Sequence, residues 1–191
     1  AHIPIKGMKR TTKVREFHMR NGRGEFTYSA KFEGEMDNEP EKGEYGEELV
    51  YEYSKRKGKN VIPIPPETPE LKYGQFKSYA PRIFTRIRGL YGIEVATFFE
   101  AICDNSFVEF VSNSKSGAFF FFSTDGRYMI KTIEQGECKC LRQMLPQYYK
   151  HLKDNPESLM CRFYGLYRLK CNKRTHYFII MESVFHTAKF I

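Results

Sequence analysis

Two short apolar segments joined by a turn constrain the fold of this chain more than any other feature. Residues 119–122 are four consecutive phenylalanines, residues 123–126 read Ser-Thr-Asp-Gly, and residues 127–133 are again mostly apolar. A polar turn ending in Asp-Gly between two β-prone runs favours a tight hairpin. We therefore expect an antiparallel hairpin here, and the rest of the chain has to supply the neighbours of its two strands.

Two helices and one strand are expected before this hairpin. Pro81 suits a first helical turn, the apolar residues after it recur on one helical face, and Gly92 is a natural end for that helix. Apolar residues recur at helical spacing again from Val95, which predicts a second helix. Residues 107–111 are expected to form the strand that precedes the hairpin.

One helix and two strands are expected after the hairpin. Residues 134–152 have helical periodicity, and Pro146 within them must either start a new helix or break this one. Residues 161–170 and 175–182 are β-prone and flank a polar turn. The predicted fold class is therefore α+β: a five-stranded antiparallel sheet with one helix inserted between its third and fourth strands, preceded by two helices. This is the layout of the N-lobe of protein-kinase-like folds.

The first part of the chain has a different texture, which predicts three segments. Residues 1–60 are polar and rich in glycine, and Phe26, Tyr28, Ala30 and Phe32 recur at every second position, as in a strand. Their glycine spacing faintly resembles the β-hairpin MORN repeat, and an irregular hairpin extension is the alternative. Residues 61–73 are a proline-rich, extended connector, and residues 74–191 form the lobe.

Charge and cysteine content indicate what kind of partner and which redox compartment to expect. A net charge of +8 favours an anionic partner, such as phospholipid headgroups, nucleotide phosphates, nucleic acid or an acidic protein. The basic run at residues 55–59 is either a solvated loop or a contact with anionic lipid.

Five cysteines without a CxxC pair suit a reducing, intracellular compartment, and the five histidines lack ligand spacing, so no metal site is expected. No apolar run approaches the roughly 20 residues of a membrane span.

Lys131 is the most informative candidate for chemistry. It lies between Ile130 and Thr132 in an expected core strand, where a lysine is costly unless an anion neutralises it. The small, polar residues 112–118 lie between two apolar strands, as does a loop that holds nucleotide phosphates through its backbone N–H groups. The helix that follows could supply Glu137 as an ion-pair partner. An edge-strand lysine that points to solvent is the alternative.

Four segments follow one another along the second half of the chain. They are Ser-Lys-Ser-Gly-Ala-Phe through Met-Ile-Lys-Thr-Ile at 114–133, Met-Leu-Pro-Gln-Tyr-Tyr-Lys-His at 144–151, Phe-Tyr-Gly-Leu-Tyr at 163–167 and Phe-Ile-Ile-Met at 178–181. This collinear set resembles the phosphatidylinositol-phosphate kinase family. The resemblance holds in order and spacing from about residue 74 to residue 185, and residues 76–84 look like the helix that precedes the lobe in that family. It is closer to the type acting on phosphatidylinositol 4-phosphate than to the 5-phosphate type, judging by Ser116-Gly117 and by Phe-Tyr-Gly at 163–165.

The resemblance implies an ATP site that works with Mg. The loop would cover the phosphates, Lys131 would contact the α- and β-phosphates, Glu137 would orient Lys131, and residues 181–183 would lie near the adenine. One departure is Ser114, where the family usually has Gly, since loss of a glycine restricts close backbone approach to phosphate; Ala118 replaces a small polar residue. The implied ATP-binding residues are Ser114, Lys115, Ser116, Gly117, Ala118, Lys131, Glu137, Met181, Glu182 and Ser183.

Catalysis is not expected from this chain by itself. It stops at Ile191, before the family's Asp-Leu-Lys-Gly-Ser motif, catalytic aspartate and metal-binding aspartate, so no catalytic or metal-binding residue is expected within it. Two hypotheses follow: the N-lobe of a phosphatidylinositol-phosphate kinase, or a degenerate, non-catalytic lobe that serves as a structural subunit of a larger, membrane-associated assembly. Expected partners are an anionic membrane surface and other proteins or a second copy. A nucleic-acid-binding module has the charge but no motif, and nucleic acid is not expected.

Overall fold

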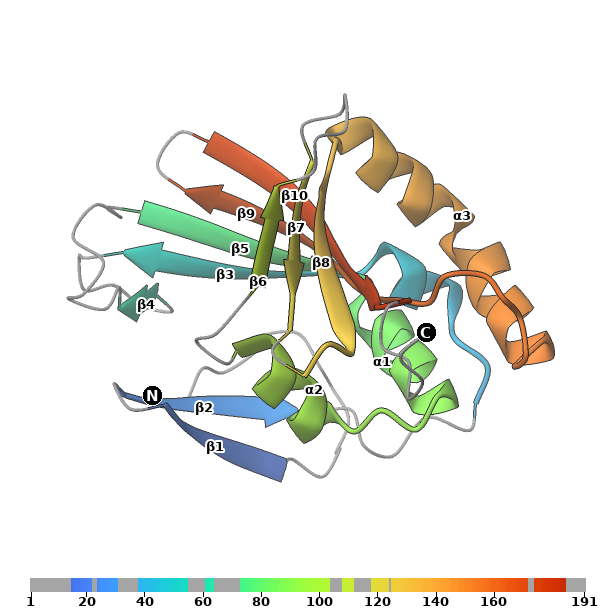
Figure 1. Ribbon diagram of the computed structural model, residues 1–191, viewed down its shortest axis with the longest axis horizontal. Coiled ribbons are helices and arrows are strands. Elements are labelled where there is room, and N and C mark those ends of the chain that lie inside the picture. Colours follow the sequence, from blue (N-terminus) through green and yellow to red (C-terminus); the bar gives the residue numbers. More distant parts are fainter. Residues whose placement is uncertain are drawn as a thin grey trace.

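The computed structural model describes residues 15–21, 24–30, 38–54, 61–63, 73–103, 108–111, 118–123, 125–171 and 174–184. Within these ranges the chain forms a two-stranded sheet, an eight-stranded sheet and helical segments that cover part of the larger sheet (Figure 1). The predicted α+β class is confirmed.

The two-stranded sheet is a hairpin near the start of the chain. Strands β1 (Arg15–Asn21) and β2 (Gly24–Ala30) pair antiparallel over their full length. The strand predicted from alternate residues 26–32 is thus confirmed up to Ala30 as β2. Phe32, the last residue of that alternation, lies outside the described residues, as do Gly34 and Met36, which continue the MORN-like spacing. The choice between a MORN-like repeat and an irregular hairpin stays open.

The large sheet has the strand order β4-β3-β5-β9-β10-β8-β7-β6. All neighbours in it run antiparallel except β3 and β4, which are parallel. The strands are β3 (Glu48–Ser54), β4 (Val61–Pro63), β5 (Tyr73–Tyr79), β6 (Val108–Val111), β7 (Phe119–Phe122), β8 (Tyr128–Ile133), β9 (Phe163–Cys171) and β10 (Arg174–Glu182). The five predicted strands and the predicted hairpin are confirmed, and β3, β4 and β5 extend the sheet beyond them.

The helix expected over residues 76–84 is wrong at its start. Residues 76–79 belong to β5, and helix α1 begins only at Pro81 and ends at Leu90. The residue before a proline is disfavoured in the helical region, and Ala80 instead has φ 44° and ψ 51° in the left-handed region. Its N–H donates to the carbonyl of Glu47 at 2.8 Å, which fixes the corner between β5 and α1.

Helix α3 (Gln135–Asp154) runs without interruption through Pro146, so both alternatives for that proline are wrong. An internal proline removes one helical hydrogen bond and costs about 3 kcal/mol. Pro146 is exposed, whereas Leu145 before it and Leu152 after it are fully buried. Burial of two such side chains is worth about 1.5–3 kcal/mol each and outweighs the cost.

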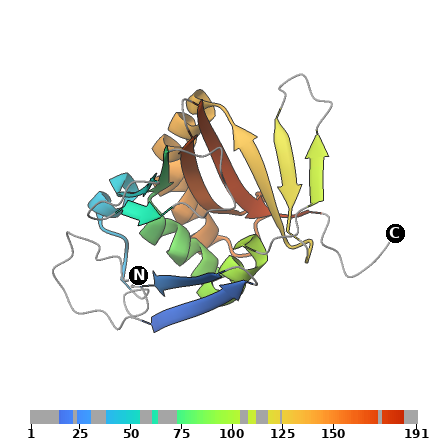
Figure 2. The same ribbon diagram turned by 90° about the vertical axis from the view of Figure 1, so that its left-hand side faces the viewer.

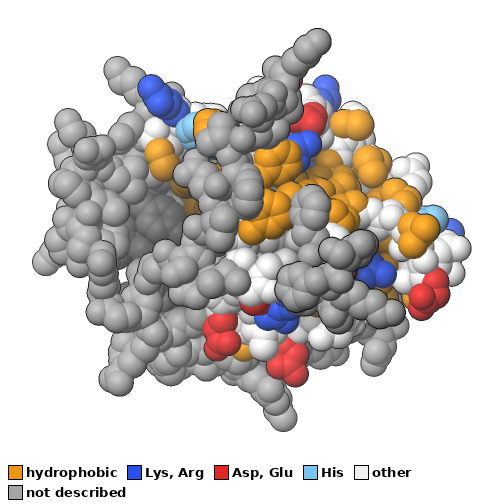
Figure 3. Space-filling view, viewed as in Figure 1, with side chains coloured by type: hydrophobic (Ala, Val, Ile, Leu, Met, Phe, Trp, Pro, Cys, Tyr) orange, Lys and Arg blue, Asp and Glu red, His pale blue; other side chains and the backbone are white. Residues whose placement is uncertain are grey.

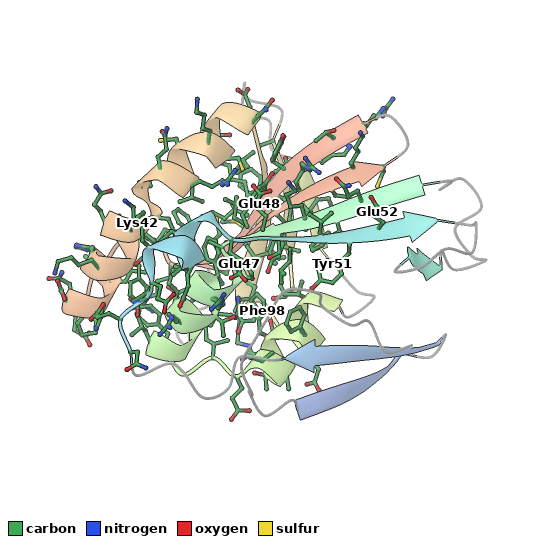
Figure 4. All side chains as sticks on the ribbon, turned by 180° about the vertical axis from the view of Figure 1, so that it is seen from behind. Lys42, Glu47, Glu48, Tyr51, Glu52 and Phe98 are labelled. Carbon is green, nitrogen blue, oxygen red and sulfur yellow. The ribbon has the colours of Figure 1, made fainter. Side chains whose placement is uncertain are left out.

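Helices α1 and α3 cover one end of the sheet. Figure 2 shows α1 and α3 beside β9 and β10, while β6 and β7 stand away from both helices. Helix α1 buries Ile83, Phe84 and Ile87 at 0–1% exposure. Helix α2 (Val95–Cys103) sends Phe98 to the sheet (Figure 4), where its ring meets that of Tyr128 edge-on at 5.2 Å between centroids.

An acidic segment before β3, which includes the short 3-10 helix η1 (Lys42–Gly46), braces α1. The guanidinium of Arg86 faces both oxygens of the Glu44 carboxylate, at 3.2 and 3.3 Å, and both side chains are buried. Arg82 pairs with Glu47 at 2.9 Å. Figure 4 shows Glu47 and Glu48 where η1 passes into β3. The segment therefore joins the lobe's helices to its sheet.

Candidate nucleotide-binding site

Lys131 lies within a straight row of side chains that crosses five strands of the sheet. Tyr79 on β5 stands opposite Leu166 on β9, Leu166 opposite Ile179 on β10, Ile179 opposite Lys131 on β8, and Lys131 opposite Phe120 on β7. Directly opposed residues of antiparallel strands project from the same face of the sheet. Because β8 has a neighbour on each side, the alternative of an edge-strand lysine is wrong.

The helical cover of this row ends at Lys131. Tyr79, Leu166 and Ile179 are 5%, 0% and 4% exposed, and the guanidinium of Arg142 on α3 lies 4.5 Å from the Tyr79 ring centroid. Lys131 and Phe120 are only half-buried, and the Lys131 Nζ lies 5.9 Å from the Phe120 ring centroid. Figure 3 shows hydrophobic side chains gathered over the surface between β8 and α3. Among the described residues of this row, Lys131 is therefore the first beyond the buried part whose side chain is partly exposed.

Glu137 lies near Lys131 in the sequence, at the first turn of α3. Its carboxylate accepts a hydrogen bond from the backbone N–H of Glu134 at 2.7 Å. Over the part of the chain that the structure describes, no carboxylate forms an ion pair with Lys131. The structure thus places the two residues at adjoining ends of β8 and α3 without joining them.

The predicted adenine segment forms the end of β10. Met181 stands opposite Met129, two residues along β8 from Lys131 and on the same face, about 7 Å away along the strand. The N–H of Glu182 donates to the carbonyl of Arg162, and the N–H of Ser183 to that of Arg127, both at 2.9 Å. The end of β10 is thus fixed from both sides, and Met181 there lies on the same face as Lys131.

The predicted phosphate loop is described only at its last residue. Residues 114–117 lie outside the described residues, whereas Ala118 is buried and leads directly into β7. The Phe119 N–H donates to the Thr132 hydroxyl at 2.8 Å, which ties the start of β7 to β8. Because Phe120 stands opposite Lys131, the end of the loop lies two residues from the lysine's cross-strand partner.

Sequence reasoning placed Asp125 in the β7–β8 turn but gave its side chain no role. Its carboxylate accepts hydrogen bonds from the Ser123 hydroxyl at 2.6 Å, the Arg127 N–H at 3.0 Å and the Arg127 side chain at 2.6 Å. Burial favours a higher pKa for Asp125, but the hydrogen bonds from Ser123 and Arg127 outweigh it and lower the pKa. The Ser-x-Asp pattern in a turn could have indicated this cap. It fixes the hairpin and hence the register of Lys131.

Phe120 is the second residue that sequence reasoning missed. Four consecutive phenylalanines do not reveal which of them faces Lys131, because the answer depends on the register of β7 against β8. Among the described residues, no helix is long and apolar enough to cross a membrane, and no three metal-ligating side chains lie in one group.

The second half of the chain matches a model of a known protein family. Residues 101–191 match the family model described as phosphatidylinositol-4-phosphate 5-kinase. This span contains β6 to β10 and α3, and with them Lys131 and every other residue predicted to bind ATP.

Individual relatives extend the match and show how much of each protein it covers. The chain is 43% identical over 122 residues to a probable phosphatidylinositol phosphate kinase of Dictyostelium discoideum, a match of 60% of this chain and 17% of that protein. It is 41% identical over 122 residues to the phosphatidylinositol 4-phosphate 5-kinase its3 of Schizosaccharomyces pombe (62% and 16%). It is 34% identical over 110 residues to the human phosphatidylinositol 4-phosphate 5-kinase type-1 alpha (58% and 20%).

The chain spans a fifth or less of the length of these three relatives. Within that span, the matched residues supply the hairpin with Lys131, the inserted helix and the last two strands of an N-lobe-like sheet. By their sequence matches, residues 101–191 belong to the phosphatidylinositol phosphate kinase family, and the fold of the described part of the chain agrees with this.

Proposed function

We propose that this chain is the nucleotide-binding lobe of a phosphoinositide kinase, which transfers the γ-phosphoryl group of ATP to a phosphoinositide headgroup. The position of Lys131 carries the proposal. It is a half-buried cation in an interior strand, at the point where the helical cover of the sheet ends, and no carboxylate pairs with it among the described residues. Such a cation is best neutralised by an anionic ligand.

Each part of the site then has a role in holding ATP. Lys131 contacts the α- and β-phosphates, and backbone N–H groups of residues 114–118 cover the phosphates. The adenine lies near residues 181–183, with the side chain of Met181 on the same face of the sheet as Lys131. Phosphoryl transfer depends largely on positioning and charge neutralisation, and both are functions that this lobe can supply.

Mg would accompany the nucleotide and neutralise charge on its phosphates. The catalytic base and the metal ligands are proposed to lie outside residues 1–191. The lipid substrate implies work at a membrane surface within a reducing compartment, and the net charge of +8 favours an anionic surface. Other proteins or a second copy of the chain remain proposed partners.

A second function is favoured by one observation, the serine at position 114 where the family usually has glycine. A side chain at this point hinders close approach of the backbone to phosphate. The lobe would then be non-catalytic and would serve as a structural subunit of a membrane-associated assembly.

Calorimetric titration of the purified full-length protein with Mg-ATP separates the two functions. We expect measurable binding that weakens at least tenfold in Lys131→Met. Lys150→Met is the matched control, since Lys150 is exposed on α3 and pairs with Asp154, and it should bind as the wild type does. Absence of Mg-ATP binding in the wild type would reject the kinase function and leave the non-catalytic one.

Phosphate transfer to lipid tests the substrate. Vesicles containing phosphatidylinositol 4-phosphate or phosphatidylinositol 5-phosphate are incubated with the full-length protein and labelled ATP. We expect label in the bisphosphate formed from the 4-phosphate lipid. Equal labelling of both lipids would contradict the preference for the 4-phosphate lipid, and labelling of neither would contradict the reaction.

A further inference from the structure

We infer that Glu137 acts as the N-terminal cap of α3 and not as the counter-ion of Lys131, whose ammonium group is positioned by the ring of Phe120. The inference deepens the proposed function and rests on it, because it concerns how Lys131 is kept ready for phosphate. It departs from the expectation that Glu137 orients Lys131 through an ion pair.

The first turn of α3 already uses the Glu137 carboxylate. Glu134 is the residue before the helix, and its backbone N–H donates to the Glu137 Oε2 at 2.7 Å. In return, the Glu134 side chain faces the backbone N–H of Glu137, the reciprocal arrangement of a capping box. The carboxylate thus holds this backbone donor and not the Lys131 ammonium, and a helix N-terminus has few other acceptors for its N–H groups.

Lys131 has a different neighbour in the same row of the sheet. Phe120 stands directly opposite it on β7, and its ring centroid lies 5.9 Å from the Lys131 Nζ, within the range of a cation–π contact. The ring is held in place because the β7–β8 hairpin is closed by Asp125 at its turn and by the Phe119–Thr132 hydrogen bond near its other end.

This arrangement has a consequence for nucleotide binding. An aromatic ring orients an ammonium group without neutralising its charge, whereas a carboxylate would compete with phosphate for it. The phosphates of the nucleotide therefore meet a cation that no carboxylate among the described residues compensates. Affinity for Mg-ATP should depend on the charge of Lys131 and on the ring of Phe120, and it should be insensitive to the charge of Glu137.

Two substitutions of Glu137 separate the cap from the counter-ion. Glu137→Gln keeps a side-chain acceptor of the same length but has no charge, and glutamine can take this place in a capping box. Glu137→Ala removes both. In the purified full-length protein we expect Glu137→Gln to bind Mg-ATP within twofold of wild type. We expect Glu137→Ala to lower the thermal midpoint by about 2–4 °C and Glu137→Gln by less than half as much.

Two substitutions of Phe120 test the ring. Phe120→Tyr keeps an aromatic face and should bind Mg-ATP as wild type does. Phe120→Leu keeps apolar bulk but has no ring, and it should weaken binding by about two- to fivefold, the size of a half-exposed cation–π contact. Equal affinity of the leucine and tyrosine variants would overturn the role of Phe120.

Failure of the Glu137 cap and failure of nucleotide binding would give different results. A tenfold or larger loss of Mg-ATP affinity in Glu137→Gln would show that the charge matters and would overturn the inference, while the nucleotide site would stand. If the wild type binds no Mg-ATP, the proposed function fails, and the thermal midpoints of the two Glu137 variants still decide the cap. Equal midpoints for these variants would reject it.

Discussion

The two ends of the large sheet have the same kind of pairing but different surroundings. At one end, β5, β9 and β10 lie under α1 and α3, and the row of opposed side chains there is almost completely buried. At the other end, β6, β7 and β8 have no such cover (Figure 2), and the same row continues through half-buried Lys131 and Phe120. We call these the covered end and the open end.

The difference shows which part of the lobe gives stability and which part is available for a ligand. Buried apolar area at the covered end contributes most of the free energy of folding. The open end keeps a cation and apolar side chains near the surface, where they gain little from folding alone. Substitutions at the covered end should therefore reduce stability, whereas the corresponding substitutions at the open end should have small effects on it.

The largest expected effect is the loss of the buried arginine of α1. Arg86→Ala removes both hydrogen bonds to the buried Glu44 carboxylate and leaves it only the longer contact with Arg82 Nη1 at 3.8 Å. This should lower the free energy of unfolding by about 3 kcal/mol, the low end for a broken buried pair. Arg127→Ala at the open end removes an exposed pair with Asp125 and should cost about 0–1 kcal/mol. Urea denaturation measures both, and equal losses would contradict the contrast.

Two isoleucines in the same face of the sheet give the next comparison. Ile179 is 4% exposed at the covered end, and Ile179→Ala should cost about 2–4 kcal/mol of stability. Ile133 on β8 is only half-buried, so Ile133→Ala should cost about half as much. A larger loss of stability in Ile133→Ala than in Ile179→Ala, measured by urea denaturation, would contradict the contrast between the two ends.

Substitution of two glycines by alanine should change the stability in opposite directions. A Cβ on Gly165 would collide with the ring of Tyr167, which is stacked on Phe178 with 5.3 Å between centroids and cannot move freely. Gly165→Ala should lower stability by about 1–3 kcal/mol. Gly136 in the first turn of α3 has nothing within 4 Å of such a Cβ, so Gly136→Ala should raise stability by up to about 1 kcal/mol. Thermal midpoints that move in the same direction would refute this reasoning.

The smallest expected effect is on acid stability. Burial favours a higher pKa for Glu48, but the hydrogen bond and charge of Lys77 and the charge of Arg142 outweigh it, so the pKa falls below its ordinary value. Asp125 at the open end is also lowered, by Ser123 and Arg127. A lowered carboxyl pKa stabilises the fold above the unfolded-state pKa, about 3.9–4.3, and this contribution is lost as the pH falls through the folded-state pKa.

Stability measured in urea at pH 7 and at pH 3 checks this expectation. The wild type should lose stability between the two, and Glu48→Gln and Asp125→Asn should each lose less, because each starts without one of these contributions. A variant with the same pH dependence as the wild type would show that its carboxylate does not contribute.

The sequence predicted the elements whose signals are local. The helical periodicity after Pro81 and Val95, the turn after the four phenylalanines and the last two strands all appear in the structure close to their expected bounds. The long helix after β8 was also expected, but its passage through Pro146 depends on burial before and after the proline, which a local pattern does not reveal.

Features that depend on distant pairing were not predictable. Strand β5 contains alternating polar residues and pairs with β9, far away in the sequence, so local propensity gave no sign of it. The buried pair of Glu44 and Arg86 also joins segments that are far apart in the sequence, so a local pattern could not predict it. Lys131 could be identified from its apolar neighbours, but its placement opposite Phe120 required the register of β7 and β8.

The most direct test of the central claim is hydrogen–deuterium exchange of the full-length protein with and without Mg-ATP. If the open end binds the nucleotide, exchange should slow in residues 114–122, in β8 and in residues 181–183. It should stay unchanged in α1 and β5, which lie at the covered end. Slower exchange in α1 and β5 without any change around Lys131 would contradict the placement of the nucleotide site at the open end of the sheet.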